Sequence, residues 1–388
     1  MRNLSETLSH PSQHEFLKGP RPRNYIPALD GLRGIAILSV LFWHCIPCCQ
    51  TFYPGWAGVD LFFVLSGYLI TGRLLDTVGE PGYLTRFYRN RILRIWPLYY
   101  ALVIPFLLLL PYIREINGAD LTLYEQHPLG FLLFVQNWTF IRFGPLEDLS
   151  LGHLWSLAIE EQFYLIWPFV IFFVRAPGRR IVLFISLILI VLVTRYIYYL
   201  FHQTGEGPIH IFYNTFFRID SLVAGSLLCQ LHRLKIIIPK GWATALVFAG
   251  LLTYPVAGMM AGHSLPLLPF NISGGFTLMA IAFACLLHLS LIPKNLFARL
   301  CDIRPLRWMG KISYGLYMIH MPVWIILGSK LFSSRWAAGW KGHEKLVYWI
   351  VALICILLSI FLSWISFRYF ESFFLRLKKS AKPAPQKI

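Results

Sequence analysis

The sequence predicts an all-α protein, a polytopic transmembrane helix bundle of about ten spans, and three observations support this. The 388 residues are 57% hydrophobic with a mean hydropathy of +0.59, which is too apolar for a soluble protein of this size. Several runs reach roughly 18–22 residues with few charges, the length that crosses a bilayer. The basic residues gather in the short segments between these runs, as in cytoplasmic loops. That distribution also accounts for the net charge of +17, so we expect no nucleic-acid partner.

The chain divides into three parts along its length. Residues 1–29 form a polar N-terminal tail without the apolar core of a signal peptide, residues 30–371 hold the spans, and residues 372–388 form a basic C-terminal tail. The ten expected spans are residues 31–47, 57–75, 92–112, 152–174, 181–201, 215–232, 242–260, 272–292, 313–331 and 346–368. Of the 35 Lys and Arg residues, 26 fall on the side of the two termini, which predicts that both tails are cytoplasmic. Residues 129–140 are apolar but too short to cross, so we expect a re-entrant or interfacial segment there.

The first span carries two ionisable residues on one face. Arg33 and His44 are eleven positions apart, which at about 100° per residue puts them on one stripe of a helix, roughly 16 Å apart along its axis. Ionisable groups inside a span are costly and usually face a protein interior or a water-filled cavity. The stripe therefore indicates a polar channel; the alternative is that Arg33 reaches the lipid headgroups and His44 caps the helix end. Asp30, three residues before Arg33, can pair with it.

The second span begins with Asp60, at the depth expected for His44. A carboxylate at this depth could orient the imidazole through one ring nitrogen and leave the other nitrogen free as a base. Asp also caps the starts of helices, so both interpretations stay open. Gly67, in the middle of the span, suits close packing against another helix.

Arg91 and Arg94 stand in the basic segment 86–94 that leads into the third span, and they share a face because they are three residues apart. Such a pair can be a topology signal alone. It can also bind a phosphate group, since a guanidinium fork matches two phosphate oxygens.

The fourth span holds polar residues at helical spacing. His153, Ser156, Glu160 and Tyr164 fall on one face, whereas Glu161 points elsewhere. Two adjacent carboxylates in an apolar helix are hard to explain as core residues. We expect Glu160 to face the same interior as the first span, although the sequence leaves open which of the two does so.

The later spans add two features. Arg218 and Asp220 in the sixth span could pair with each other. His320 in the ninth span shares a face with Tyr317, but a lone intramembrane histidine is more typical of a structural role. Cys45, Cys48 and Cys49 follow His44 with metal-ligand spacing, yet no second cluster completes a site, so we expect no metal and leave a disulfide open.

Taken in order, these motifs resemble the integral-membrane acyltransferase-3 family, whose signature is an arginine and a histidine separated by ten residues, as in Arg33 and His44. The other matching landmarks are residues 58–68, 91–94, 153–164, 313–320 and 368–371. The resemblance covers nearly all of residues 24–375. It implies a multi-pass protein of the bacterial inner membrane that moves an acyl group, acetyl above all, from cytoplasmic acyl-CoA to a hydroxyl of a sugar, glycan or glycolipid outside.

This resemblance assigns expected roles to the residues singled out above. The catalytic candidates are His44 as general base, Arg33, Asp60 and Glu160; the acyl-CoA ligands are Arg91 and Arg94; the secondary candidates are His153, Glu161, His320 and Asp30. The expected partners are acyl-CoA, with acetyl-CoA foremost, a carbohydrate or glycolipid acceptor, and the bilayer. The alternative is a transporter, because polar residues along spans can line a pathway, but no inverted repeat supports it. The sequence leaves the acyl group, the acceptor and the oligomeric state open.

Overall fold

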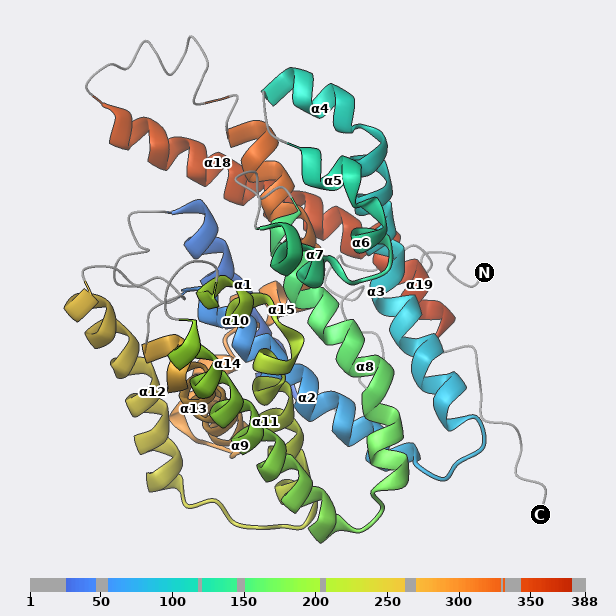
Figure 1. Cartoon of the computed structure of the whole chain (residues 1–388), viewed down its shortest axis with the longest axis vertical. Coiled ribbons are helices and arrows are strands. Elements are labelled where there is room, and N and C mark those ends of the chain that lie inside the picture. The colour runs from blue at the N-terminus through green and yellow to red at the C-terminus, as the bar shows by residue number, and fades with distance from the viewer. Residues whose placement is uncertain are drawn as a thin grey trace, which may run out of the picture.

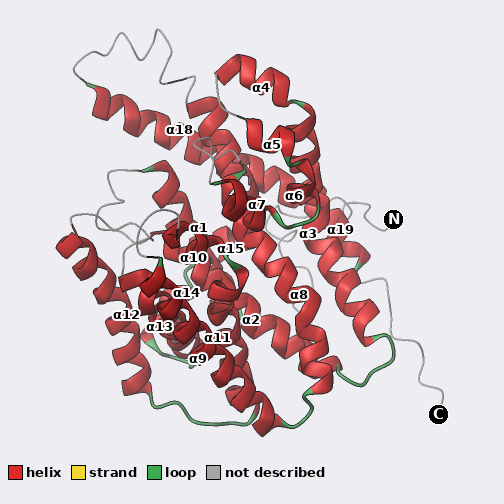
Figure 2. Ribbon diagram, viewed as in Figure 1, coloured by secondary structure: helices red, strands yellow, loops and turns green. Residues whose placement is uncertain are grey.

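The computed structural model describes residues 26–46, 55–117, 121–144, 151–202, 207–261, 270–328, 331 and 343–378. Within these ranges the regular elements are helices and there is no strand, which confirms the predicted fold class (Figure 2). Most of the N-terminal tail, the last ten residues, and Cys48 and Cys49 lie outside the described residues, so the question of a disulfide stays open there.

Long helices occupy all ten predicted ranges (Figure 1). They are α1 (Pro27–Cys45), α2 (Gly58–Thr77), α3 (Tyr83–Leu108), α8 (Trp155–Phe173), α9 (Pro177–Phe201), α11 (Thr215–Arg233), α12 (Lys240–Ala261), α13 (Phe276–Leu291), α15 (Arg304–Val323) and α18 (Glu344–Ile365). By length and composition, seven helical stretches of the described chain could cross a membrane. Of the ten long helices, the three that lie outside these stretches are α11, α12 and α15. The protein is a multi-pass membrane protein, while the number of spans and the side of the termini stay predictions.

Short helices connect the long ones. They are η2 (Gly55–Ala57), α4 (Leu110–Asn117), α5 (Thr122–Gln126), α6 (Pro128–Leu132), α7 (Gln136–Phe143), η3 (Gly152–Leu154), α10 (Gly207–Tyr213), η4 (Asn271–Gly275), α14 (Leu296–Cys301), η5 (Trp324–Gly328), η6 (Ser366–Glu371) and α19 (Ser372–Leu377). Figure 1 shows α4 to α7 toward one end of the bundle.

Two helices begin well before the predicted spans. α3 starts at Tyr83, so Arg91 lies about two turns and Arg94 about three turns inside a helix, and not in the loop that precedes it. α15 starts at Arg304, nine residues before the expected span at 313. The reason is physical: hydropathy marks the part of a helix that suits lipid, whereas backbone hydrogen bonding continues through polar residues beyond it.

Close backbone contacts at glycines hold two pairs of helices together. α1 packs along α15, where a Cβ on Gly34 would overlap the carbonyl of Leu306 and one on Gly310 would overlap that of Asp30. α2 packs along α11 in the same way, through Gly67 and Gly225. Small residues allow such approaches in membrane bundles, and the prediction that Gly67 serves close packing is confirmed.

Residues 129–140 fold into α6, a turn and α7 and pack into the bundle. Phe134 in the turn has φ 56° and stacks on Tyr99 with ring centroids 4.1 Å apart. Gln136 and Asn137 are fully buried, and their amides donate to the Leu154 carbonyl at 2.7 Å and to Thr215 Oγ1 at 2.9 Å. These two amide groups anchor the segment in the bundle, although the buried Oε1 of Gln136 has no hydrogen-bond partner in the described chain, and the position of the segment in the membrane stays a prediction.

Candidate active site

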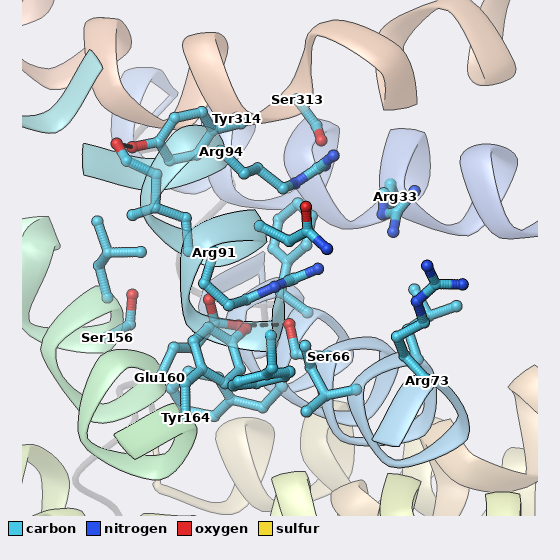
Figure 3. Close-up of a pocket in the computed structure, with 18 of the residues that line it drawn as sticks. Arg33, Ser66, Arg73, Arg91, Arg94, Ser156, Glu160, Tyr164, Ser313 and Tyr314 are labelled. Atoms are coloured by element: carbon cyan, nitrogen blue, oxygen red, sulfur yellow. Dashed lines mark hydrogen bonds between the residues drawn. The ribbon is translucent and has the colours of Figure 1, made fainter. Parts of the chain in front are cut away.

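A cavity of about 570 Å³ lies between α1, α2, α3, α8 and α15 (Figure 3). One end of it is strongly basic. The cations in its lining are Arg33, Arg73, Arg86, Arg91, Arg94 and Lys378. The early start of α3 produces this arrangement, because residues of its first three turns face the cavity. The three elements α1, α2 and the C-terminal end of α19 supply the remaining cations.

Only some of these cations have partners. Arg33 Nη1 lies 3.0 Å from Asp30 Oδ1, which confirms the pair expected from their spacing, and Arg86 Nη1 lies 2.7 Å from Glu80 Oε2. Arg91 lies over the ring of Tyr164 with its Cζ 5.7 Å from the ring centroid, and its buried Nε has no hydrogen-bond partner.

The other three cations of the lining differ from Arg33 and Arg86. Within the part of the chain that the structure describes, no side-chain hydrogen bond or ion pair is formed by Arg73, Arg94 or Lys378. Together with Arg91, these residues leave the basic end of the cavity with an excess of positive charge. An anion is the natural complement of such a site.

Deeper in the cavity lies one carboxylate. Glu160 Oε1 accepts a hydrogen bond from Ser66 Oγ at 2.7 Å, and both side chains line the cavity. The adjacent Glu161 does not line it and instead accepts from Trp96 Nε1 at 3.1 Å. The expectation that Glu160 faces the same interior as Arg33 is therefore confirmed.

Ser156 and Tyr317 form the inner end of the cavity. The Tyr317 hydroxyl donates to the backbone carbonyl of His153 and is hydrogen-bonded to Ser156 Oγ. Behind this pair lie three histidines from three elements: His44 from α1, His153 from η3 and His320 from α15. His44 does not line the cavity, so Tyr317 and Ser156 separate it from the basic end.

The hydrogen bonds of His320 and His44 define the tautomers of these two rings. His320 Nδ1 lies 2.8 Å from the Tyr317 carbonyl and 3.0 Å from that of Leu316, so it carries a proton and donates. Its Nε2 is then an acceptor in the neutral ring, and the 3.0 Å contact to His44 Nδ1 is a bond that His44 donates. The Nε2 of His44 is consequently unprotonated.

The exposure of the three rings differs. His44 is half-buried, whereas His153 and His320 are buried. The ring of His320 lies 5.1 Å, centroid to centroid, from each of the other two. The sequence named all three as candidates but did not predict that they meet. The shared face of His320 and Tyr317 was the available signal.

Asp60 does not orient His44. Both of its oxygens lie 2.9 Å from Arg218 Nη2, and Asp60 Oδ1 also accepts from Ser221 Oγ. The carboxylate does not cap the start of α2 either. A fully buried carboxylate needs a positively charged partner, and a neutral imidazole carries no charge. Arg218 on α11 provides that charge.

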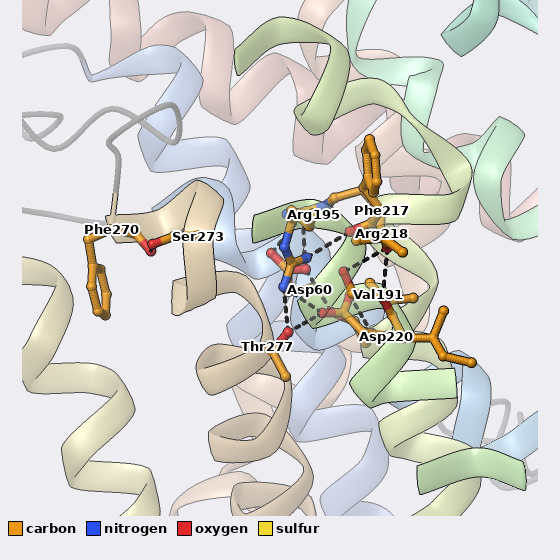
Figure 4. A network of polar contacts seen from close by, with 12 residues as sticks. Asp60, Val191, Arg195, Phe217, Arg218, Asp220, Phe270, Ser273 and Thr277 are labelled. Atoms are coloured by element: carbon orange, nitrogen blue, oxygen red, sulfur yellow. Dashed lines mark hydrogen bonds and ion pairs between the residues drawn. The ribbon is translucent and has the colours of Figure 1, made fainter. Parts of the chain in front are cut away.

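The expected pair of Arg218 with Asp220 is wrong (Figure 4). Asp220 Oδ2 instead lies 3.1 Å from Arg195 Nη2 on α9 and 2.6 Å from Thr277 Oγ1 on α13. Residues two apart on a helix point about 200° apart, so Arg218 and Asp220 face different neighbours. The Arg218 guanidinium also stacks on Phe276, with Cζ 3.8 Å from the ring centroid.

The cysteines and other potential ligands do not assemble into a metal centre in the described ranges, where no group of three or more His, Cys, Asp and Glu side chains could hold an ion. Cys45 is buried and carries a free thiol.

Comparisons with known proteins identify the family and several relatives of this chain. A family model described as an acyltransferase domain matches residues 26–368. The chain is 29% identical over 367 residues to the peptidoglycan O-acetyltransferase OatA of Listeria monocytogenes, covering 90% of this chain and 56% of that protein. It is 28% identical over 370 residues to the O-acetyltransferase OatA of Staphylococcus aureus, covering 92% and 58%. The chain thus spans little more than half the length of these relatives. No solved structure matches it.

Proposed function

The chain belongs to the acyltransferase-domain family, and on that premise we propose that it is a membrane O-acyltransferase that moves an acetyl group from cytoplasmic acetyl-CoA to a hydroxyl of a glycan at the outer side. The named activities of the relatives support an acetyl group and a peptidoglycan-like acceptor. The observation that carries the proposal is the cavity itself. It joins a cluster of unpaired cations to the hydroxyls of Ser156 and Tyr317, and the Tyr317 ring in turn contacts the rings of His153 and His320.

The basic end of the cavity suits the nucleotide of acetyl-CoA. Its diphosphate and phosphate monoester need several cations, and Arg91 and Arg94 offer guanidinium forks that no carboxylate of the described chain occupies. The thin pantetheine arm would then extend past Glu160 toward Ser156 and Tyr317. The thioester would lie at the inner end of the cavity.

His44 would act there as general base. In the proposed step, its Nε2 accepts the proton of the acceptor hydroxyl while the hydroxyl oxygen forms a bond to the thioester carbonyl carbon. The C–S bond breaks as the tetrahedral intermediate collapses, and the thiolate of CoA leaves and takes up the proton from His44 Nε2, which restores the neutral base. The lone pair of His320 Nε2 accepts from His44 Nδ1 throughout and stabilises the imidazolium that forms. His320 thereby takes the orienting role that the sequence suggested for Asp60.

This mechanism requires one movement. Because Tyr317 and Ser156 stand between the cavity and the histidines, the acetyl group reaches His44 only when the Tyr317 side chain leaves its bond to the His153 carbonyl. A rotation about side-chain bonds is sufficient for a group as small as acetyl.

Acetyl-CoA turnover by the purified protein in lipid nanodiscs tests the proposal. With a soluble glycan acceptor, His44→Gln should lower the rate of CoA thiol release by about 10²–10⁴-fold, as for loss of a general base. The matched control is His202→Gln, an exposed histidine at the end of α9, which should keep the wild-type rate. Wild-type protein that neither binds nor consumes acetyl-CoA, or a folded His44→Gln variant within about tenfold of wild type, would contradict the proposal.

A further inference from the structure

Lys378 reaches the basic end of the cavity from a part of the chain beyond residue 368, where the family match ends. α18 continues through η6 into α19, and α19 packs against α3 (Figure 1). Arg89 Nη2 on α3 donates to the carbonyl of Leu377 at 3.1 Å. This bond holds the residue before Lys378 at the cavity and so positions the ammonium group.

The surroundings of Lys378 are electrostatically unfavourable in the absence of an anion. The side chain is half-buried. Burial, together with the positive charges of Arg94 and Arg91, lowers the pKa of the Lys378 ammonium from 10.5 to about 7. The charged groups around this end of the cavity are Arg33 on α1, Arg73 on α2, Arg86, Arg91 and Arg94 on α3, Glu160 on α8 and, on η6, the buried Glu371 bonded to Ser366.

The neighbouring carboxylates relieve this repulsion only in part: Glu160 attracts Arg91 and Arg94, and Glu371 attracts Arg94, but neither forms an ion pair with them in the described chain. Asp30 and Glu80 are paired with Arg33 and Arg86, and Glu160 accepts from Ser66 deeper in the cavity. Three unpaired cations from two separate elements, Lys378, Arg91 and Arg94, thus meet at one place. A phosphate group bound between them would remove the repulsion and supply charge-assisted acceptors to all three.

We propose that Lys378 is a donor-binding residue whose ammonium group contacts a phosphate of the CoA nucleotide together with Arg91 and Arg94. This inference rests on the proposed function, because it assigns part of the donor site. It makes the end of α19 a component of that site.

The proposal gives donor affinity a pH dependence with a defined sign. Only the protonated lysine attracts a phosphate, and its lowered pKa means that the charge is lost as the pH rises through about 7. CoA affinity of the wild-type protein should therefore fall between about pH 6.5 and pH 8.5, a range above the second phosphate pKa of about 6. Lys378→Arg keeps its charge throughout this range and should retain high affinity at the upper pH. Lys378→Met should bind weakly at both.

Equilibrium binding of CoA to the full-length chain in phosphatidylcholine nanodiscs tests this inference. At about pH 6.5, Lys378→Met should weaken CoA binding about tenfold, the typical effect of one charge-assisted hydrogen bond. The matched control is Lys240→Met, an exposed lysine at the start of α12, which should bind as wild type does. Rescue by Lys378→Arg separates a charge effect from a structural one.

The outcomes distinguish this inference from the proposed function. If wild type binds CoA and Arg94→Met weakens that binding while Lys378→Met leaves both affinity and pH dependence unchanged, the inference is overturned and the donor site stands. If Lys378→Met leaves CoA binding unchanged but reduces the phosphatidylglycerol that the protein retains, Lys378 binds lipid headgroups instead. That result also overturns the inference. If wild type binds no CoA at any pH, both the inference and the proposed donor fail.

Discussion

The arginines of this protein fall into two groups with opposite environments. Arg195 and Arg218 are fully buried, and each bonds to a carboxylate from another helix, Asp220 and Asp60. Arg91 and Arg94 line an open cavity and have no such partner in the described chain. A guanidinium whose charge is matched inside the protein joins helices, whereas one left unmatched at a cavity is available to a ligand. The chemistry of the side chain is the same in both groups, which differ in their burial and in the presence of a carboxylate partner.

The largest expected effect comes from breaking a matched pair. Arg218→Met should destabilise the protein by about 3–5 kcal/mol, because it leaves the buried carboxylate of Asp60 without its cation. Thermal unfolding followed by size-exclusion chromatography would measure the loss. Adding Asp60→Asn to the same chain should recover part of the stability, since the double variant no longer buries an uncompensated charge. A single variant as stable as wild type would remove the distinction between the two groups.

A smaller effect is expected at an unmatched arginine, and on binding instead of stability. Arg94→Met should leave the unfolding temperature unchanged and weaken CoA binding about tenfold, corresponding to one lost charge-assisted contact. Arg94→Lys should recover only part of the affinity, because an ammonium cannot form the bidentate contact. The comparison fails if Arg94→Met unfolds as readily as Arg218→Met does, since Arg94 would then be structural as well.

The smallest effect should follow a change that leaves a matched pair intact. Thr277→Val removes a hydroxyl that bonds both Arg195 and Asp220 but keeps the ion pair between them. We expect a loss of about 1 kcal/mol, the net value of an ordinary hydrogen bond, in the same unfolding measurement. The control is Thr277→Ser, which keeps the hydroxyl. A loss as large as that of Arg218→Met would show that the hydroxyl, and not the carboxylate, satisfies Arg195.

The features that the sequence could predict are those that depend on short spacings. The pairing of Asp30 with Arg33 and the inward face of Glu160 both follow from helical periodicity, and the apolar runs located all ten long helices. Hydropathy could not show that α3 begins at Tyr83, because polar turns of a helix carry no apolar signal. It therefore put Arg91 and Arg94 in a loop.

Contacts between distant parts of the chain cannot be predicted from periodicity and hydropathy. Asp60 and Arg218 are 158 residues apart, and His44 and His320 are 276 residues apart. Several arrangements of ten helices bring different polar residues to the same depth, and periodicity does not choose among them. The sequence thus singled out the histidines that the structure brings together, while the partner of Asp60 and the proposed orienting partner of His44 depend on which helices are neighbours.

The glycine contacts between α1 and α15 restrict what can move. With the backbones touching at Gly34 and Gly310, the two helices cannot slide or separate without losing that contact along their length. His44 and His320 therefore form a rigid unit, and the barrier between them and the cavity is a single pair of hydroxyl side chains, Tyr317 and Ser156. Under the proposed function, an opening of that size would admit an acetyl group without a continuous water column. The membrane around the protein would keep its proton and ion gradients during every cycle of transfer.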